Sequence, residues 1–227
     1  MTESLKTHAR RSPIDAWITA HATATTVREG MLQADILAPT AATDPTVTLS
    51  EYSWRRRLGL KGPAAEQWLA AQGYTVPALG NHWAVTAGVL VARLATSEFL
   101  VEALTPDAQA RVRASAQTLY GVTRISDVYP VARHDLVLNL HGSALETLLR
   151  QICSVDFAPL LASASDAQGP LSMTSMIGVG VVAIATRTTD LPVLTLWADP
   201  SFGLYFWTTV LEVATELGGG VRVHGLN

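Results

Sequence analysis

The chain has 227 residues and a mass of 24.2 kDa, which suits one ordinary domain or two small fused lobes. It is 48% hydrophobic but only 15% charged, against roughly 25% charged in an average soluble protein, so it can bury a large core and leaves apolar surface for a partner. The net charge of −3 excludes a sequence-wide field that would attract nucleic acid or anionic lipid. The single cysteine, Cys153, can neither form an internal disulfide nor hold a zinc ion alone.

Residues 1–50 are rich in threonine, alanine and serine and show only a short amphipathic stretch around Trp17. We interpret them as an amino-terminal arm that carries one short helix or strand. The basic residues at the start are not followed by the apolar stretch of a signal peptide, and the longest apolar run, residues 176–185, is about half a membrane span. These features predict a soluble, cytoplasmic protein without a membrane partner.

From residue 51 onward, strand and helix patterns alternate. The predicted elements of the first half are a strand over 57–61, a helix over 64–72, a hairpin of strands 89–94 and 98–103, and a helix over 107–119. The second half repeats this order with a strand over 136–140, a helix over 144–152, a hairpin of strands 179–186 and 193–197, and a helix over 202–217.

The two halves also match in sequence when one is shifted by 80 residues. The matching pairs are Leu58 with Leu138, Leu60 with Leu140, Gly62 with Gly142, Ala64 with Ala144, Glu66 with Glu146, and Leu69 with Leu149. We therefore predict an α+β fold of two ferredoxin-like split β-α-β repeats with mostly antiparallel strands. This duplicated domain covers residues 51–227, with lobes at about 51–125 and 126–220.

One glycine-rich motif imitates the dinucleotide-binding fingerprint. Gly178, Gly180 and Ala183 have the right spacing, but the residues after Gly180 read as a strand instead of opening a helix toward a pyrophosphate. We predict no nucleotide binding here, and a strand glycine that lies close to a neighbouring strand.

Candidate metal ligands and nucleophiles are isolated from one another. His134 and His141 lie seven residues apart across a predicted strand, and this odd spacing places them on opposite faces as solvated or edge histidines. Cys153 lacks a basic neighbour that would lower its pKa and reads as a buried structural thiol. The acids near strand ends and loops form no close pair for acid–base catalysis; they are Asp127, Asp135 and Asp156.

A tryptophan followed by three arginines, Trp54 to Arg57, resembles a patch that stacks bases and binds phosphates. Strand alternation divides these arginines between two faces, so carboxylate pairing within the chain or across subunits is the better interpretation and no nucleic-acid partner is predicted. From the residues alone, the chain therefore has no predicted catalytic, cofactor-binding or metal site.

Four segments in order carry a resemblance to a known family. They are residues 8–13 (HARRSP), residues 95–101 (ATSEFLV), the run of Leu140, Gly142 and Leu149 with Cys153, Ser154 and Asp156, and residues 199–206 (DPSFGLYF). Together they resemble the gamma subunit of heterotetrameric sarcosine oxidase, collinearly from about residue 9 to 218. This family shares the fold of the folate-binding domain of aminomethyltransferase, whose FDVSHM motif is similar to the stretch at Asp127 and Val128.

The resemblance implies a non-catalytic, gamma-type subunit of an oxidoreductase acting on CH–NH donors. A heterotetramer of this kind is flavin-dependent and oxidatively demethylates an N-methylated amine, with tetrahydrofolate as the acceptor in one-carbon metabolism. No cofactor is expected on this chain. FAD, FMN, NAD and tetrahydrofolate are expected on the flavin-bearing and dinucleotide- or folate-binding partner subunits.

The amino-terminal arm is the expected interface with those partners. Arg10, Arg11 and Pro13 match the family although they precede the compact repeats, where packing within the chain contributes little. Paired arginines can form forked bonds with carboxylates, and Trp17 can serve as an apolar anchor. We therefore predict that residues 8–17 lie against another subunit.

A second hypothesis is a free-standing, tetrahydrofolate-binding protein of one-carbon transfer. Such a site needs a carboxylate for the pterin ring and an arginine for the glutamate tail. Asp127 or Asp156 could supply the carboxylate and Arg133 the cation. The resemblance itself does not imply folate chemistry on this chain, because residues 178–184 lack the aspartate that the transferase pattern carries.

Overall fold

The computed structural model describes residues 10–37, 45–187 and 190–222. Its first elements are helix α1 (Asp15–His21) and a hairpin of strands β1 (Ala22–Arg28) and β2 (Met31–Leu37). Glu29 and Gly30 at the hairpin turn both have positive φ, 49° and 77°, as a tight two-residue turn between twisted strands requires. Sequence analysis expected one short element near Trp17, and the structure places α1 there; the hairpin was not predicted.

The next part contains the predicted strand–helix–hairpin–helix order. Its elements are β3 (Thr48–Glu51), β4 (Arg57–Lys61), α2 (Ala65–Ala71), β5 (His82–Thr86), β6 (Val89–Ala95), β7 (Glu98–Ala103), α3 (Pro106–Leu119) and β8 (Tyr129–Val131). The Thr105 side chain accepts a hydrogen bond from the Ala108 amide and Pro106 opens α3, which fixes where this helix begins. The predicted elements from 57 to 119 are confirmed, whereas β3, β5 and β8 were missed.

The order then recurs. The remaining elements are β9 (Leu136–His141), α4 (Leu145–Ile152), α5 (Ala158–Ala162), β10 (Gln168–Met176), β11 (Val179–Thr186), β12 (Val193–Ala198), the 3-10 turn η1 (Pro200–Phe202), α6 (Gly203–Glu216) and β13 (Gly220–Val221). The strands and helices predicted between 136 and 217 are confirmed. Gly178 lies in the turn between β10 and β11, and Gly180 lies within β11, so the glycine motif opens no helix. Gly180 is paired with Ser175 of the neighbouring strand β10, but no atom beyond the chain neighbours lies within 4 Å of a Cβ built on it, so no close packing requires a glycine here.

Within the described residues, the strands other than the β1–β2 hairpin form one eleven-stranded sheet in the order β13-β3-β9-β12-β11-β10-β5-β6-β7-β4-β8. Every pairing is antiparallel except that of β13 with β3. The α+β class with mostly antiparallel strands is therefore confirmed. We call β4 to β8 the first half, and β9 to β13 together with β3 the second half.

A shared glycine contact supports the equivalence of the halves. Gly62 directly follows β4 and has φ of 127°, and Gly142 directly follows β9 and has φ of 135°. The amide of Ala64 donates to the Asp127 carbonyl at 3.1 Å, just as the amide of Ala144 donates to the Thr46 carbonyl at 3.0 Å. In each half, the residue whose carbonyl accepts this bond precedes a strand. Asp127 precedes β8, which pairs with β4, and Thr46 precedes β3, which pairs with β9. The counterpart of β8 in the second half is therefore β3, which lies before the first half in the sequence.

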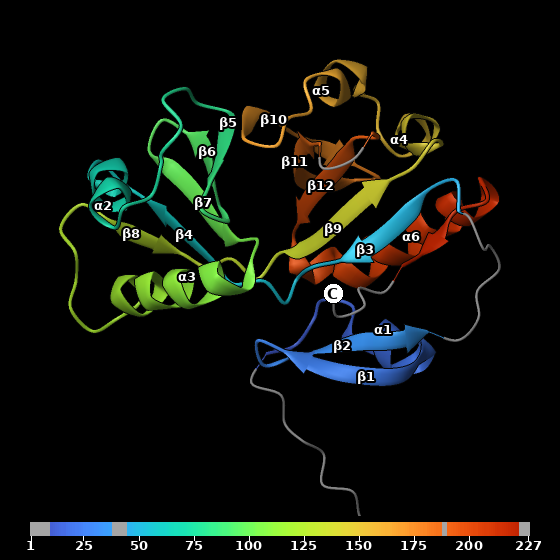
Figure 1. Cartoon of the computed structure of the whole chain (residues 1–227), viewed down its shortest axis with the longest axis horizontal. Coiled ribbons are helices and arrows are strands. Elements are labelled where there is room, and N and C mark those ends of the chain that lie inside the picture. Colours follow the sequence, from blue (N-terminus) through green and yellow to red (C-terminus); the bar gives the residue numbers. More distant parts are fainter. Residues whose placement is uncertain (1–9, 38–44, 188–189, 223–227) are drawn as a thin grey trace, which may run out of the picture.

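The helices cover the outer faces of the two halves, and the helix-free faces meet between them (Figure 1). One buried cluster joins α2 and α3 to the first half, and a second joins α1, α4 and α6 to the second half. A third cluster connects the two sheet faces; it contains Trp83, Leu90, Ala92, Leu94, Leu100, Val137, Leu171, Ile184 and Trp197. No helix within the described ranges is long and apolar enough to cross a membrane.

Candidate functional site

The largest cavity described lies on the helix-free face of the sheet and has a volume of about 860 Å³. Its wall follows one register row across three strands, in which Ser50 of β3 pairs with Asn139 of β9 and Asn139 pairs with Thr195 of β12. The Thr195 hydroxyl donates to the Asn139 side-chain oxygen at 2.9 Å. Polar residues thus alternate with core leucines along otherwise apolar strands because their face lines this central cavity.

Aromatic and charged groups complete the central cavity. The Arg55 guanidinium lies 3.8 Å from the centre of the Tyr52 ring, within cation–π distance. Burial raises the pKa of Tyr52, although Arg55 and Arg28 act in the opposite direction. His141, Asp166, Asp190 and Arg222 add titratable groups to the wall. A volume of this size with aromatic, amide and cationic groups suits a small planar anion or a polar heterocycle.

A buried ion cluster beside the central cavity contains residues of both halves. Glu102 of β7 is fully buried, and its carboxylate pairs with Arg55 and Arg57, each at 3.3 Å. The indole nitrogen of Trp197 in β12 donates to the same carboxylate at 2.7 Å. Arg57 also donates to the carbonyls of Ser53 and Asp135 at 3.0 and 3.1 Å. These bonds cross from the first half to the second, so the cluster fixes how the two sheet faces meet.

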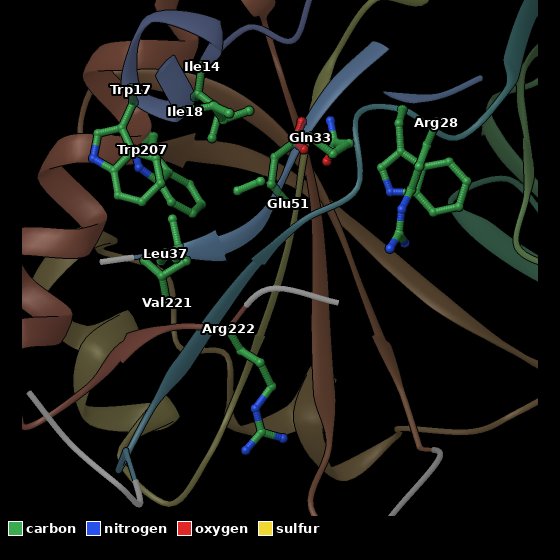
Figure 2. A pocket seen from close by; sticks show the side chains of 12 residues that line it. Ile14, Trp17, Ile18, Arg28, Gln33, Leu37, Glu51, Trp207, Val221 and Arg222 are labelled. Carbon is green, nitrogen blue, oxygen red and sulfur yellow. The ribbon is translucent and has the colours of Figure 1, made fainter. Parts of the chain in front are cut away.

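A much smaller cavity, of about 30 Å³, lies beneath the amino-terminal hairpin (Figure 2). Trp17 and Trp207 lie side by side at one end, and Gln33 and Glu51 lie together near its centre. The Trp17 and Trp207 rings meet edge to face with centroids 4.9 Å apart. This volume is far below that of an organic-ligand site, so the cavity is a packing feature between the arm and the second half.

Glu51 is the polar centre of that junction. Its Oε1 accepts hydrogen bonds from the Ser12 hydroxyl at 3.0 Å and the Ser53 amide at 3.1 Å. Its Oε2 is buried without a hydrogen-bond partner among the described residues. Burial raises the pKa of Glu51, and the bonds from Ser53, Ser12 and Gln33 only partly offset this.

Replacing this carboxyl should change how stability depends on pH. Because the folded pKa of Glu51 lies above the unfolded value, its contribution is fully present at low pH and is lost as pH rises through the folded pKa. Glu51→Gln cannot ionise, so its free energy of unfolding should improve relative to wild type as pH rises from 4 to 8 in urea titrations.

Glu29→Gln is the control, because its effect on the free energy of unfolding should depend on pH in the opposite direction. Burial raises the pKa of Glu29, but hydrogen bonds from Arg56 and Arg113 outweigh it and the net pKa is lowered. The loss caused by Glu29→Gln should therefore be present at neutral pH and shrink as pH falls through the folded pKa. A Glu51→Gln difference that is independent of pH would contradict the raised pKa.

The predicted interface residues of the arm make contacts within the chain. Arg10 donates to the Trp54 carbonyl at 2.7 Å and the Ser53 carbonyl at 3.2 Å, and Trp17 packs on Trp207. Burial, followed by repulsion from Arg56 and Arg57, lowers the pKa of Arg10 to about 10. The expectation that the arm gains little from its own chain is therefore wrong, because Arg10 and Trp17 belong to the core side of the arm.

Arg11 and Pro13 differ from Arg10 in their surroundings. Arg11 is exposed, whereas Pro13 is half-buried beside Gly203 at the start of α6. The prediction that this arm contacts another subunit stays a prediction, and Arg11 is the residue of the set that remains accessible. Residues 8 and 9 lie outside the described ranges.

The proposed folate residues are not gathered at one cavity. Asp127 is exposed with its side chain near Ser126, Asp156 accepts from the Ala158 amide at 3.0 Å, and Arg133 pairs with Glu98 at 2.9 Å. None of the three lines the central cavity. Sequence reasoning missed Asn139 and Thr195; the available signal was polar residues on alternate positions of strands that are otherwise leucine-rich.

The other motifs singled out in the sequence lie as follows. His134 is exposed outside β9, as expected, whereas His141 is half-buried in the wall of the central cavity, on a strand that is paired on both sides and is not a sheet edge. Cys153 is buried, and its thiol donates to the Ser175 carbonyl. Arg55, Arg56 and Arg57 pair with carboxylates, as expected. Across the described ranges no group of three histidine, cysteine or acidic residues could hold a metal ion.

The sequence matches no protein-family model and no curated protein. Solved structures share its fold, among them the following two. One is a chain of the heterotetrameric sarcosine oxidase from Corynebacterium sp. U-96, determined with pyrrole 2-carboxylate, with 23% identity, a TM-score of 0.60, and coverage of 95% of this chain and 99% of that chain. The other is the glycine cleavage system aminomethyltransferase T from Bartonella henselae, with 14% identity and a TM-score of 0.58. That match covers 89% of this chain and 57% of the aminomethyltransferase.

Proposed function

We propose that this chain is a non-catalytic, gamma-type subunit of a heteromeric, flavin-dependent enzyme that resembles sarcosine oxidase. The observation that carries the proposal is the nearly complete, two-way overlap with one chain of a heterotetrameric sarcosine oxidase, 95% of this chain and 99% of that one. Two proteins of the same extent and fold can occupy the same place in a complex. The enzyme would oxidatively demethylate an N-methylated amine and pass the carbon to tetrahydrofolate.

The surface of the chain favours a partner. Large apolar side chains that are exposed by two-fifths or more gather at η1 and the first turn of α6; they are Phe202, Leu204 and Tyr205. Two more, Val27 and Ile36, lie on the β1–β2 hairpin. Exposed aromatic side chains close together are typical of interfaces. In this proposal FAD, FMN, NAD and tetrahydrofolate are bound by the partner subunits.

We also interpret the two halves as ferredoxin-like split β-α-β repeats. The first half supports this because the order β4, α2, β6, β7, α3, β8 arranges its strands as β6-β7-β4-β8. In the second half β3 lies beside β9, where the first half has β8. The domain division proposed from sequence, an arm over 1–50 and lobes at about 51–125 and 126–220, stays a prediction.

Purification from the native host tests the subunit assignment. A tagged chain should bring down a flavoprotein with the 450 nm absorbance of oxidised flavin, and the complex should oxidise sarcosine or a related N-methylated amine. The chain expressed alone should be colourless and inactive. Recovery from the native host without a flavoprotein, or as an active monomer, would refute the proposal; the tag expressed by itself is the control.

The central cavity favours one alternative, a free-standing tetrahydrofolate-binding protein of one-carbon transfer. Its volume and its Tyr52, Arg55 and Asn139 wall suit a planar heterocycle better than the dispersed Asp127, Asp156 and Arg133. Calorimetric titration of the isolated chain separates the alternatives. Heat released on adding tetrahydrofolate below millimolar concentration supports this second function, and its absence removes it.

A further inference from the structure

A third pocket, of about 350 Å³, lies where the amino-terminal arm crosses the segment before β9. Four cationic or protonatable side chains line it, namely Arg10, Arg11, Arg57 and His134, and Pro13 and Pro200 form apolar walls. No residue in the described lining is acidic. We call it the arginine pocket. Its composition contrasts with the central cavity, where acids and bases are mixed.

Two of the arginines are held by the protein. Arg10 donates to the carbonyls of Trp54 and Ser53, and Arg57 donates to the Glu102 carboxylate and to the carbonyls of Ser53 and Asp135. These bonds leave both guanidinium groups fixed and charged. They form a rigid cationic floor that needs no ordering when a ligand binds.

The other two groups have no partner within the described part of the chain. Arg11 and His134 are exposed, and no hydrogen bond or ion pair is formed by either side chain. Arg57 adds positive charge behind them but no accessible donor at Nε, since this atom is buried 3.9 Å from an Asp135 carboxylate oxygen. Free donors beside fixed positive charge are what an oxyanion requires.

Acids lie behind the two fixed arginines. Glu102 and Asp135 face Arg57, and Glu29 and Glu51 face Arg10. The lining of the pocket itself holds Arg10, Arg11, Arg57 and His134 and no acidic side chain. A carboxylate placed in the pocket would therefore meet hydrogen-bond donors and positive charge on its walls.

The border of the arginine pocket indicates the source of the anion. Pro200, one of its walls, begins the segment that continues to the exposed Phe202, Leu204 and Tyr205. An aromatic surface beside forked arginine donors is the composition of protein interfaces, whereas a free small anion needs no apolar border. A protein segment could place an acidic group in the pocket and apolar side chains on α6.

We propose that the arginine pocket binds a carboxylate of the partner subunit, with Arg11 as the forked donor and His134 as a second donor, while the partner's adjoining apolar residues cover Phe202 and Tyr205. This inference rests on the proposed function, because it names how that partner is held. It also divides the roles of the two arm arginines. Arg11 would contact the partner subunit, whereas Arg10 bonds to carbonyls of its own chain and adds positive charge to the pocket.

The test measures binding of the co-purified flavoprotein to wild type and to Arg11→Glu at two salt concentrations. The variant should bind at least about tenfold more weakly at low salt, and wild-type binding should weaken as salt rises. His134→Glu should weaken binding in the same direction. Arg124→Glu is the matched control, since Arg124 is another exposed arginine with no ion pair in the described structure, and its affinity should stay within about twofold of wild type.

Each outcome has a separate meaning. Equal affinity of wild type and Arg11→Glu for the flavoprotein overturns the pocket proposal and leaves the proposed function intact. Failure of wild type to bind any flavoprotein refutes the proposed function, and the partner of the pocket with it. If inorganic phosphate raises the melting temperature of wild type but not of Arg11→Glu, while assembly is unaffected, the pocket holds a free oxyanion and the partner carboxylate is overturned.

Discussion

Replacing Glu102 by glutamine should lower the free energy of unfolding by about 3–5 kcal/mol, the loss typical when one partner of a buried ion cluster is removed. The carboxylate is fully buried and forms ion pairs with both Arg55 and Arg57, whose side chains are 13% and 1% exposed. Glutamine preserves the shape but not the charge. Arg57 would then remain buried with only a distant carboxylate, Asp135 at 3.9 Å, to oppose its charge.

Urea unfolding of the isolated chain, followed by tryptophan fluorescence, measures this loss. Trp197 donates to Glu102, so its emission should also shift in the folded variant. Glu146→Gln is the control because Glu146 forms an exposed pair with Arg150 within α4, and such pairs contribute at most about 0.5 kcal/mol. A Glu102→Gln loss no larger than the Glu146→Gln loss would show that the cluster does not hold the halves together.

The regular core of both halves could be predicted from the sequence because its signals are local. The alternation in residues 57–61 and 136–140 and the capping at Thr105 and Pro106 depend on a few neighbouring residues. The shift of 80 residues further indicated that Gly62 and Gly142 play the same part. Their positive φ angles and matched carbonyl contacts give that repeat a physical reason.

Two of the missed strands, β3 and β8, are defined by partners that are distant in the sequence. Strand β3 has only four residues, and its register is set by β9, almost ninety residues later. β8 has three residues and is likewise defined by its pairing with β4. Such short strands carry too little pattern to be distinguished from loops before their partners are known.

The candidate sites were predictable only in part for the same reason. Arg10, Arg11 and Pro13 could be selected from sequence, but Arg57 and His134 join them only through folding. The central cavity likewise gathers Ser50, Asn139 and Thr195 from three strands. Sequence spacing within one strand reveals a shared face, whereas a cavity requires the order of strands in the sheet.

The backbone that leads into β3 makes a close contact with Gly142, and the second large expected effect concerns this contact. Gly142→Ala should lower the free energy of unfolding by about 2 kcal/mol or more, since a side chain there combines a disfavoured φ with a steric clash. At φ of 135°, an added Cβ would overlap the Thr46 carbonyl oxygen and lie 2.8 Å from the Val47 Cα. Both belong to backbone that leads into β3, so the clash cannot be relieved by turning a side chain.

Gly180→Ala is the matched control, because Gly180 lies in a strand of the same half and no atom beyond its chain neighbours lies within 4 Å of its added Cβ. Removing glycine flexibility there should stabilise the chain by up to about 1 kcal/mol. Gly62→Ala should behave like Gly142→Ala, since its Cβ would overlap the Asp127 carbonyl oxygen before β8. Urea titration of the three variants measures their free energies of unfolding relative to wild type. If Gly142→Ala is as stable as Gly180→Ala, β3 is not held against β9 by this contact, and the equivalence of β3 with β8 loses its physical basis.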